Sequence, residues 1–142
     1  YVVRNQLDSA MTVGNEALTV VPDSDVYLAA KSNLLLEQGK LQECIEVSKK
    51  VIEVNQKLAD PYYNAGICYF NLAVDQDKNS HNSRKAKEQV EENYRKALPY
   101  LVKYRELEPK EQGKWAFPLY TIYLNLNMGK EFDEIDKVMK QK

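Results

Sequence analysis

The sequence of 142 residues has little of what metal sites, disulfide frameworks and nucleic-acid interfaces require. It contains two cysteines and one histidine, too few to suggest a metal cage or a disulfide framework. Its 20 Lys and Arg residues and 21 Asp and Glu residues leave a net charge of −1, whereas nucleic acid is usually met by a basic excess. No apolar run approaches the ~18 residues that a membrane helix needs. We therefore expect neither nucleic-acid binding nor membrane insertion.

Glycine and proline are also scarce, with five of each, and this is few for a turn-rich all-β chain. Hydrophobic residues make up 44% of the sequence, more than a disordered chain carries. The length suits one ordinary domain or a short stack of repeats. These counts favour a folded, predominantly helical protein.

The chain is similar to itself at a spacing of 34 residues. Small or apolar residues coincide at this spacing in the pairs Ala10–Cys44, Val20–Val54, Leu28–Tyr62 and Leu35–Tyr69. After Ala73 the phase is lost, and it returns 19 residues later, where Cys44 maps to Ala97. A final shift of 57 residues maps Tyr63 to Tyr120. The pattern predicts successive copies of one structural unit, the second of which carries an insertion.

Within each unit, apolar residues recur every three or four positions, which predicts amphipathic helices. A first helix is predicted from about Val3 to Val21, where Pro22 ends it. The helices predicted after it cover about 25–38, 41–55, 60–74, 84–107, 114–127 and 131–140. Gly39 permits a turn after the first of these. The polar stretch 75–83 shows no period and is predicted to be a loop. Pro99 lies inside the long fourth helix, where it predicts a kink or a break.

Helix pairs of this length, with small residues where the helices meet, resemble the tetratricopeptide repeat. The resemblance rests on a first-helix pattern of Tyr62, Tyr63, Asn64, Ala65, Gly66 and Tyr69, and on a second-helix pattern of Ala97, Leu101, Leu107 and Pro109. It implies an all-α fold, a right-handed superhelical stack of antiparallel helix pairs. The single domain 1–142 then comprises a half repeat (1–24), a repeat (25–58), a repeat with an insertion (59–109) and a shortened repeat (116–142).

Each repeat in such a stack buries its apolar face only against its neighbours. A half repeat at the N-terminus therefore leaves an apolar stripe of Val3, Leu7 and Met11 uncovered. Two explanations remain open. The chain is the C-terminal part of a longer repeat protein, or it self-associates through this face as a homodimer.

The resemblance also implies that the first helix of each pair lines a concave surface that binds a protein or peptide. The predicted groove residues are Asn33, Leu36, Tyr63, Asn64, Ile67, Phe70, Phe117 and Tyr120. Asparagine amides would hold the peptide backbone, and the aromatic rings would supply contact area. The alternative is that the aromatic side chains pack against neighbouring repeats and contact no ligand.

Some members of the family clamp the acidic C-terminal tail of heat-shock chaperones with two asparagines and several basic residues. Asn33 and Asn64 match the two asparagines, but Ala29, Phe117 and Thr121 stand where the basic residues are needed. Because a carboxylate is not held by apolar groups, an acidic tail does not fit. A more apolar peptide is the expected ligand.

The remaining candidate sites are weak. The stretch from Asp75 begins like an EF-hand loop, but Ser80 and Ala86 replace the required glycine and glutamate. Cys44 and Cys68 occupy small-residue positions and are predicted to be buried. The single histidine, in the polar insertion, has no fixed partner. We therefore expect no catalysis, no cofactor and no metal.

Two functions follow from the sequence. The first is an interaction scaffold, and the second is a structural or oligomerisation segment. A regulatory domain attached to a catalytic one upstream is a third arrangement, and the residues do not fix a cellular compartment.

Overall fold

The computed structural model describes residues 25–79 and 83–141, which form six α-helices and no strand. The helices are α2 (Asp25–Glu37), α3 (Leu41–Val54), α4 (Asp60–Asn79), α5 (Arg84–Leu107), α6 (Gln112–Asn125) and α7 (Gly129–Lys140). The predicted all-α fold is confirmed for this part of the chain. No helix within it is both long enough and apolar enough to cross a bilayer.

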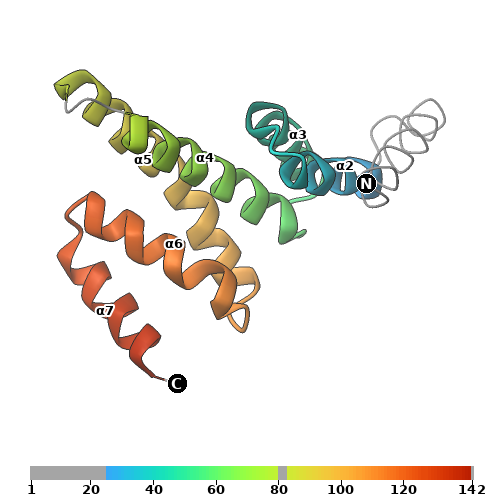
Figure 1. Ribbon diagram of the computed structural model, residues 1–142. Coiled ribbons are helices and arrows are strands. Elements are labelled where there is room, and N and C mark those ends of the chain that lie inside the picture. Colours follow the sequence, from blue (N-terminus) through green and yellow to red (C-terminus); the bar gives the residue numbers. More distant parts are fainter. Residues whose placement is uncertain (1–24, 80–82, 142) are drawn as a thin grey trace.

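Each helix packs against the next one along the chain, from α2 and α3 at one end of the molecule to α6 and α7 at the other (Figure 1). Helix α4 also packs against α2, and α6 also packs against α4. The backbones of the second helices do not come this close to one another: within the described residues, α3 does not pack against α5, nor α5 against α7, as α2 and α6 pack against α4. The first helices of the three pairs, α2, α4 and α6, therefore form one contiguous row, which we call the inner row.

The turns that join α2 to α3 and α6 to α7 have the same geometry. Gly39 (φ 76°) and Asn127 (φ 56°) both adopt the left-handed conformation that ends a helix. The next backbone N–H in each turn reaches back five residues: Lys40 donates to the carbonyl of Leu35 at 3.0 Å, and Met128 to that of Tyr123 at 2.9 Å. The turn predicted at Gly39 is confirmed, and the first and last pairs are closed by the same local chemistry.

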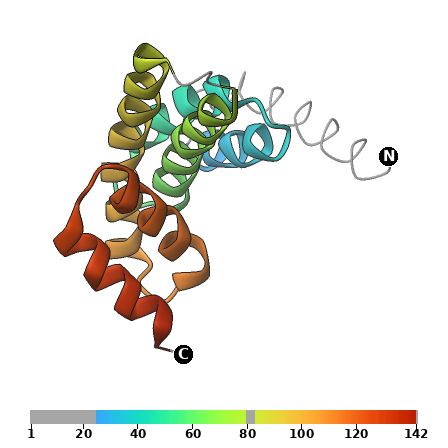
Figure 2. The same ribbon diagram turned by 60° about the vertical axis from the view of Figure 1, so that its left-hand side comes forward.

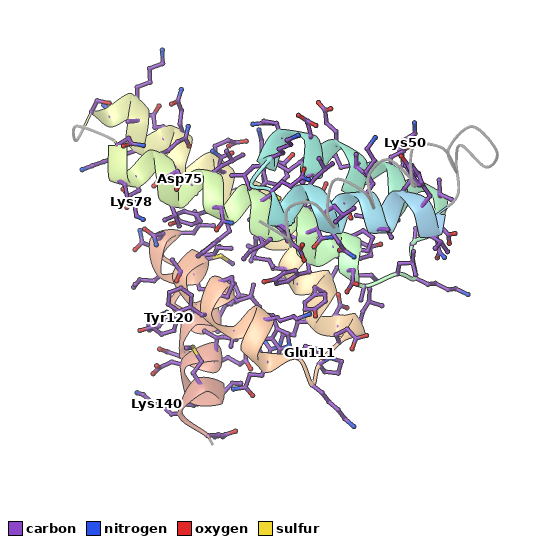
Figure 3. The ribbon with its side chains drawn as sticks, turned by 45° about the vertical axis from the view of Figure 1, so that its right-hand side comes forward. Lys50, Asp75, Lys78, Glu111, Tyr120 and Lys140 are labelled. Carbon is purple, nitrogen blue, oxygen red and sulfur yellow. The ribbon has the colours of Figure 1, made fainter. Side chains whose placement is uncertain are left out.

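The insertion lengthens helices, and the prediction of a loop from residue 75 is wrong as far as Asn79. Helices α4 and α5 have 20 and 24 residues, and their joined ends project past their neighbours (Figure 1). The Asn93 amide donates to Gln76 Oε1 at 2.6 Å across the two helices. The polar residues 75–79 belong to α4, and Asp75 and Lys78 are exposed near its end (Figure 3).

Helix α5 runs without interruption through Pro99, so the predicted break is absent. Pro99 and Arg95, whose carbonyl the proline ring leaves without a donor, are both exposed. On that side of the helix, solvent can replace the missing backbone hydrogen bond. Ser83 caps the start of the same helix by accepting a hydrogen bond from the N–H of Ala86 at 3.1 Å.

Aromatic pairs fill the interface between α4 and α5. The ring centroids are 5.1 Å apart for Tyr63–Tyr104, 6.0 Å for Tyr69–Tyr100 and 5.9 Å for Phe70–Tyr94. Gly66 lies between these residues along α4, and a Cβ atom there would come within 2.7 Å of Leu101 Cγ. The missing side chain of Gly66 therefore lets the two helices approach closely.

A second cluster joins α5, α6 and α7. The guanidinium of Arg105 donates two hydrogen bonds to the carboxylate of Glu134, at 2.9 and 2.8 Å. The same guanidinium lies 4.4 Å from the ring centroid of Trp115. The indole N–H of Trp115 donates to the carbonyl of Glu108 at 3.2 Å. This cluster ties the last helix pair to the second.

We predict that Gly66→Ala lowers the free energy of unfolding by about 1–2 kcal/mol. The clash with the fully buried Leu101 outweighs the gain in helix propensity. Urea unfolding followed by circular dichroism measures the change. Gly113→Ala is the matched control, because nothing lies within 4 Å of its added Cβ. An equal or higher stability of Gly66→Ala would show that close approach at this position is not required.

We predict that the ion pair between Arg105 and Glu134 weakens in acid. The hydrogen bonds from Arg105 hold the pKa of Glu134 below its ordinary value of 4.5. This stabilisation is therefore present above about pH 4.5 and is lost as the pH falls through the lowered pKa.

The measurement compares the wild type with Glu134→Gln. At pH 7 the wild type is more stable by under about 1 kcal/mol, since the pair is partly exposed. Fluorescence of the single tryptophan, Trp115, reports unfolding, and the difference between the two proteins shrinks towards about pH 3. A difference independent of pH contradicts the prediction.

Candidate protein-binding surface

All eight predicted groove residues lie on the inner row, but their exposure differs. Asn33 and Phe117 are exposed, Leu36, Tyr63, Ile67 and Tyr120 are half-buried, and Asn64 and Phe70 are buried. The sequence pattern therefore predicted residues that all lie on the three helices of the inner row. It did not separate the residues that reach the surface from those that hold the helices together.

Asn64 is only 3% exposed and joins two helices of the inner row. Its side-chain amide donates to Ser32 Oγ at 2.9 Å and to Asn33 Oδ1 at 2.6 Å. The two amide hydrogens are thus both used within the protein. Asn64 fixes α4 against α2 and orients the side chain of Asn33, which stays at the surface. In this arrangement Asn33 is the asparagine that a peptide can reach.

Phe70 is also mainly a packing residue. Its ring contacts Tyr94 with centroids 5.9 Å apart and Phe117 with centroids 6.4 Å apart. Phe117 covers one side of Phe70 and is nevertheless 60% exposed. Tyr63 packs against Tyr104, and the Lys114 ammonium lies 5.6 Å from the Tyr63 ring centroid. Phe70, and in part Tyr63, therefore packs between helices.

Large apolar side chains are exposed along the inner row. Val26 on α2 is 73% exposed, and Phe117 and Leu124 on α6 are 60% and 54% exposed. The predicted inward positions, these three included, are Val26, Ala29, Asn33, Leu36, Tyr63, Asn64, Ile67, Phe70, Phe117, Tyr120, Thr121 and Leu124, none of them charged. The surface is therefore suited to an uncharged, partly apolar ligand, and it has no row of cations for an acidic one.

The two cysteines are packing residues, as predicted. Both are fully buried, and Cys44 Sγ lies 3.3 Å from the carbonyl oxygen of Ser32 and 3.8 Å from Ser48 Oγ. A hydrogen bond with Cys44, together with burial, raises the pKa of the Cys68 thiol. A protonated, inaccessible thiol is a poor nucleophile. The cysteines therefore contribute to helix packing.

Several sequence predictions fall on residues outside the described part of the chain. They are the first predicted helix (3–21), its self-association stripe of Val3, Leu7 and Met11, and the histidine His81. Within residues 25–79 and 83–141, no three His, Cys, Asp or Glu side chains are grouped as a metal site requires.

Comparison with known proteins finds no protein-family model that matches the chain. It also finds no significant match among curated proteins.

We predict that Asn64 and Asn33 respond differently to truncation. Asn64→Ala removes both hydrogen bonds of a buried amide and lowers the free energy of unfolding by about 1–2 kcal/mol. Asn33→Ala removes only the bond from Asn64 to Asn33, whose acceptor lies at the surface where water can replace it, and lowers this free energy by about half as much. Chemical denaturation of the two variants measures both values. Equal effects would mean that Asn64 is not the residue that ties α4 to α2.

Proposed function

We propose that this protein is a non-catalytic interaction scaffold, a tetratricopeptide-like superhelical stack that binds a peptide segment of a partner protein along the inner row. The observation that carries the proposal is the packing of alternate helices: the backbones of α2 and α4, and of α4 and α6, lie close together, whereas those of α3, α5 and α7 do not. A stack whose helices are closer on one side curves towards that side. The inner row then becomes a concave surface, as in other repeat proteins.

The exposed side chains indicate the chemistry of the ligand. Val26, Phe117 and Leu124 offer apolar area, and Asn33 offers a donor and an acceptor to an extended backbone. Neighbouring packed helices are about 8–10 Å apart, so three of them span a peptide of about six residues. We infer an extended, uncharged peptide with apolar side chains, and no acidic tail.

The test is selection from a library of displayed heptapeptides, followed by fluorescence anisotropy with the best binder. We expect uncharged, apolar sequences to be enriched. Val26→Asp and Phe117→Asp, at opposite ends of the inner row, each weaken binding about tenfold or more, because a carboxylate is desolvated against an apolar ligand.

Val54→Asp on α3 is the matched control, since Val54 is 50% exposed but lies outside the inner row. It leaves the affinity unchanged within about twofold. Enrichment of acidic peptides, or binding that ignores Val26→Asp and Phe117→Asp, contradicts the proposal. A dimer that Leu7→Asp abolishes would favour the alternative function, a structural or oligomerisation segment that pairs through its N-terminal face.

A further inference from the structure

Helices α2 and α4 lie side by side in the inner row (Figure 2), and a chain of hydrogen bonds links them through Asn64. The hydroxyl of Ser32 donates to the carbonyl of Ala29 at 2.8 Å. The side-chain nitrogen of Asn64 donates to Ser32 Oγ at 2.9 Å and to Asn33 Oδ1 at 2.6 Å. The chain therefore connects a backbone carbonyl of α2 to Asn33, which is exposed.

The direction of each bond in this chain is set by the Ala29 carbonyl, which can only accept. A serine hydroxyl has one hydrogen, and Ser32 donates it to that carbonyl. Ser32 Oγ is then an acceptor, so the nitrogen of the Asn64 amide, and not its oxygen, faces it. Ser32 and Asn64 are both buried, so these groups pair with each other and not with solvent. The second hydrogen of the same nitrogen goes to Asn33, whose amide therefore turns its oxygen towards Asn64.

The Asn33 amide consequently presents its nitrogen to a ligand. Its Oδ1 accepts from Asn64, and its Nδ2 donates to no residue in the described part of the chain. Because the amide is planar and its oxygen faces Asn64, the nitrogen lies on the side away from Asn64. An asparagine side chain can in general donate or accept. Here the bond from Asn64 leaves two free N–H donors at the surface.

Two free donors select an acceptor on the ligand. In an uncharged, extended peptide the acceptor that they meet is a backbone carbonyl oxygen. A backbone N–H in the same place would be left unpaired, which costs binding free energy. The contact requires no N–H from the ligand and is therefore compatible with a proline residue at that position.

We propose that Asn33 is a specificity-determining residue that donates from Nδ2 to one backbone carbonyl of the bound peptide. Asn64 is the positioning residue, since it holds the Asn33 amide in the orientation that this donation requires. The inference rests on the proposed function and deepens it, because it concerns the polarity of one contact on the same inner row. A residue that is only 3% exposed thereby takes part in recognition through its neighbour.

The probe is the tightest-binding heptapeptide from the library selection. Unlabelled analogues, each with one backbone carbonyl replaced by a thiocarbonyl, compete with the labelled parent peptide in fluorescence anisotropy. Because a thiocarbonyl is a weaker acceptor, we expect one analogue to bind the wild type about threefold or more weakly than the parent peptide. The same analogue and the parent bind Asn33→Ala equally. If no analogue loses affinity in this Asn33-dependent way, the inference is wrong.

Asn33→Asp separates a donor from an acceptor. Its carboxylate still accepts from Asn64, so the variant stays folded, which circular dichroism verifies, but it has no hydrogen to donate. We expect it to bind the parent peptide about tenfold or more weakly, and Val54→Asp, the control outside the inner row, to retain the affinity. The loss caused by the thiocarbonyl disappears as well, whereas a general effect of the added charge would leave it in place. Parent affinity equal to that of the wild type overturns the inference, since Asn33 would then accept from an N–H.

Asn64→Ala tests the positioning role. Without Asn64 the Asn33 amide can turn either way, so we expect the parent peptide and the thiocarbonyl analogue to bind this variant with nearly the same affinity. Both peptides meet the same folded protein, and a loss of stability alone therefore does not change the ratio of their affinities. A ratio equal to that of the wild type, in a variant that circular dichroism shows to be folded, rules out positioning by Asn64.

Failure of this inference is distinguishable from failure of the proposed function. If the selection enriches no peptide, or if binding ignores Phe117→Asp, the proposed function fails and the inference fails with it. If Phe117→Asp weakens binding whereas Asn33→Asp does not, the binding surface stands and only the assignment of Asn33 as a donor is wrong.

Discussion

The close packing of α4 against α5 is the contact on which the rest of the structure depends. These are the two longest helices, and every other described helix packs on one of them or on a helix that does. Gly66 lets the backbones approach at Leu101, and aromatic pairs such as Tyr69–Tyr100 fill the space on either side. Aromatic rings bury much area in defined geometries, so this interface fixes one relative position of the two helices. That position sets where α3 and α6 dock.

The same helices that build the interior also supply the proposed binding surface. In a helix of the inner row, some side chains pack against neighbouring helices and others face solvent. Residues of these two kinds lie within one helical turn of each other. Asn64 holds α4 against α2, whereas Ile67, three residues later, is half-buried. The surface thus inherits its shape from the core, and its exposed side chains contact an already ordered support. Such preorganisation lowers the entropic cost of binding a flexible peptide.

Most of the helix pattern could be predicted from the sequence, because amphipathic periodicity and turn residues are local properties. The helices of the first and last pairs, and the turn at Gly39, lie within a few residues of their predicted positions. The insertion was mispredicted since its polar residues carry no period on their own. Residues 75–79 are helical because α4 and α5 support each other, as in the Gln76–Asn93 hydrogen bond. That support is tertiary and is not visible in a local window.

For the described part of the chain, the sequence by itself determined that it is helical, about where its helix pairs begin and end, and which residue types face a common side. Only the tertiary structure decided which of those residues remain exposed and can contact a ligand. Asn33 and Asn64 look equivalent in the sequence. In the structure Asn33 is exposed, whereas Asn64 donates both of its amide hydrogens to side chains on α2. Periodicity tells which side of a helix is apolar, whereas burial depends on whether another helix arrives to cover it.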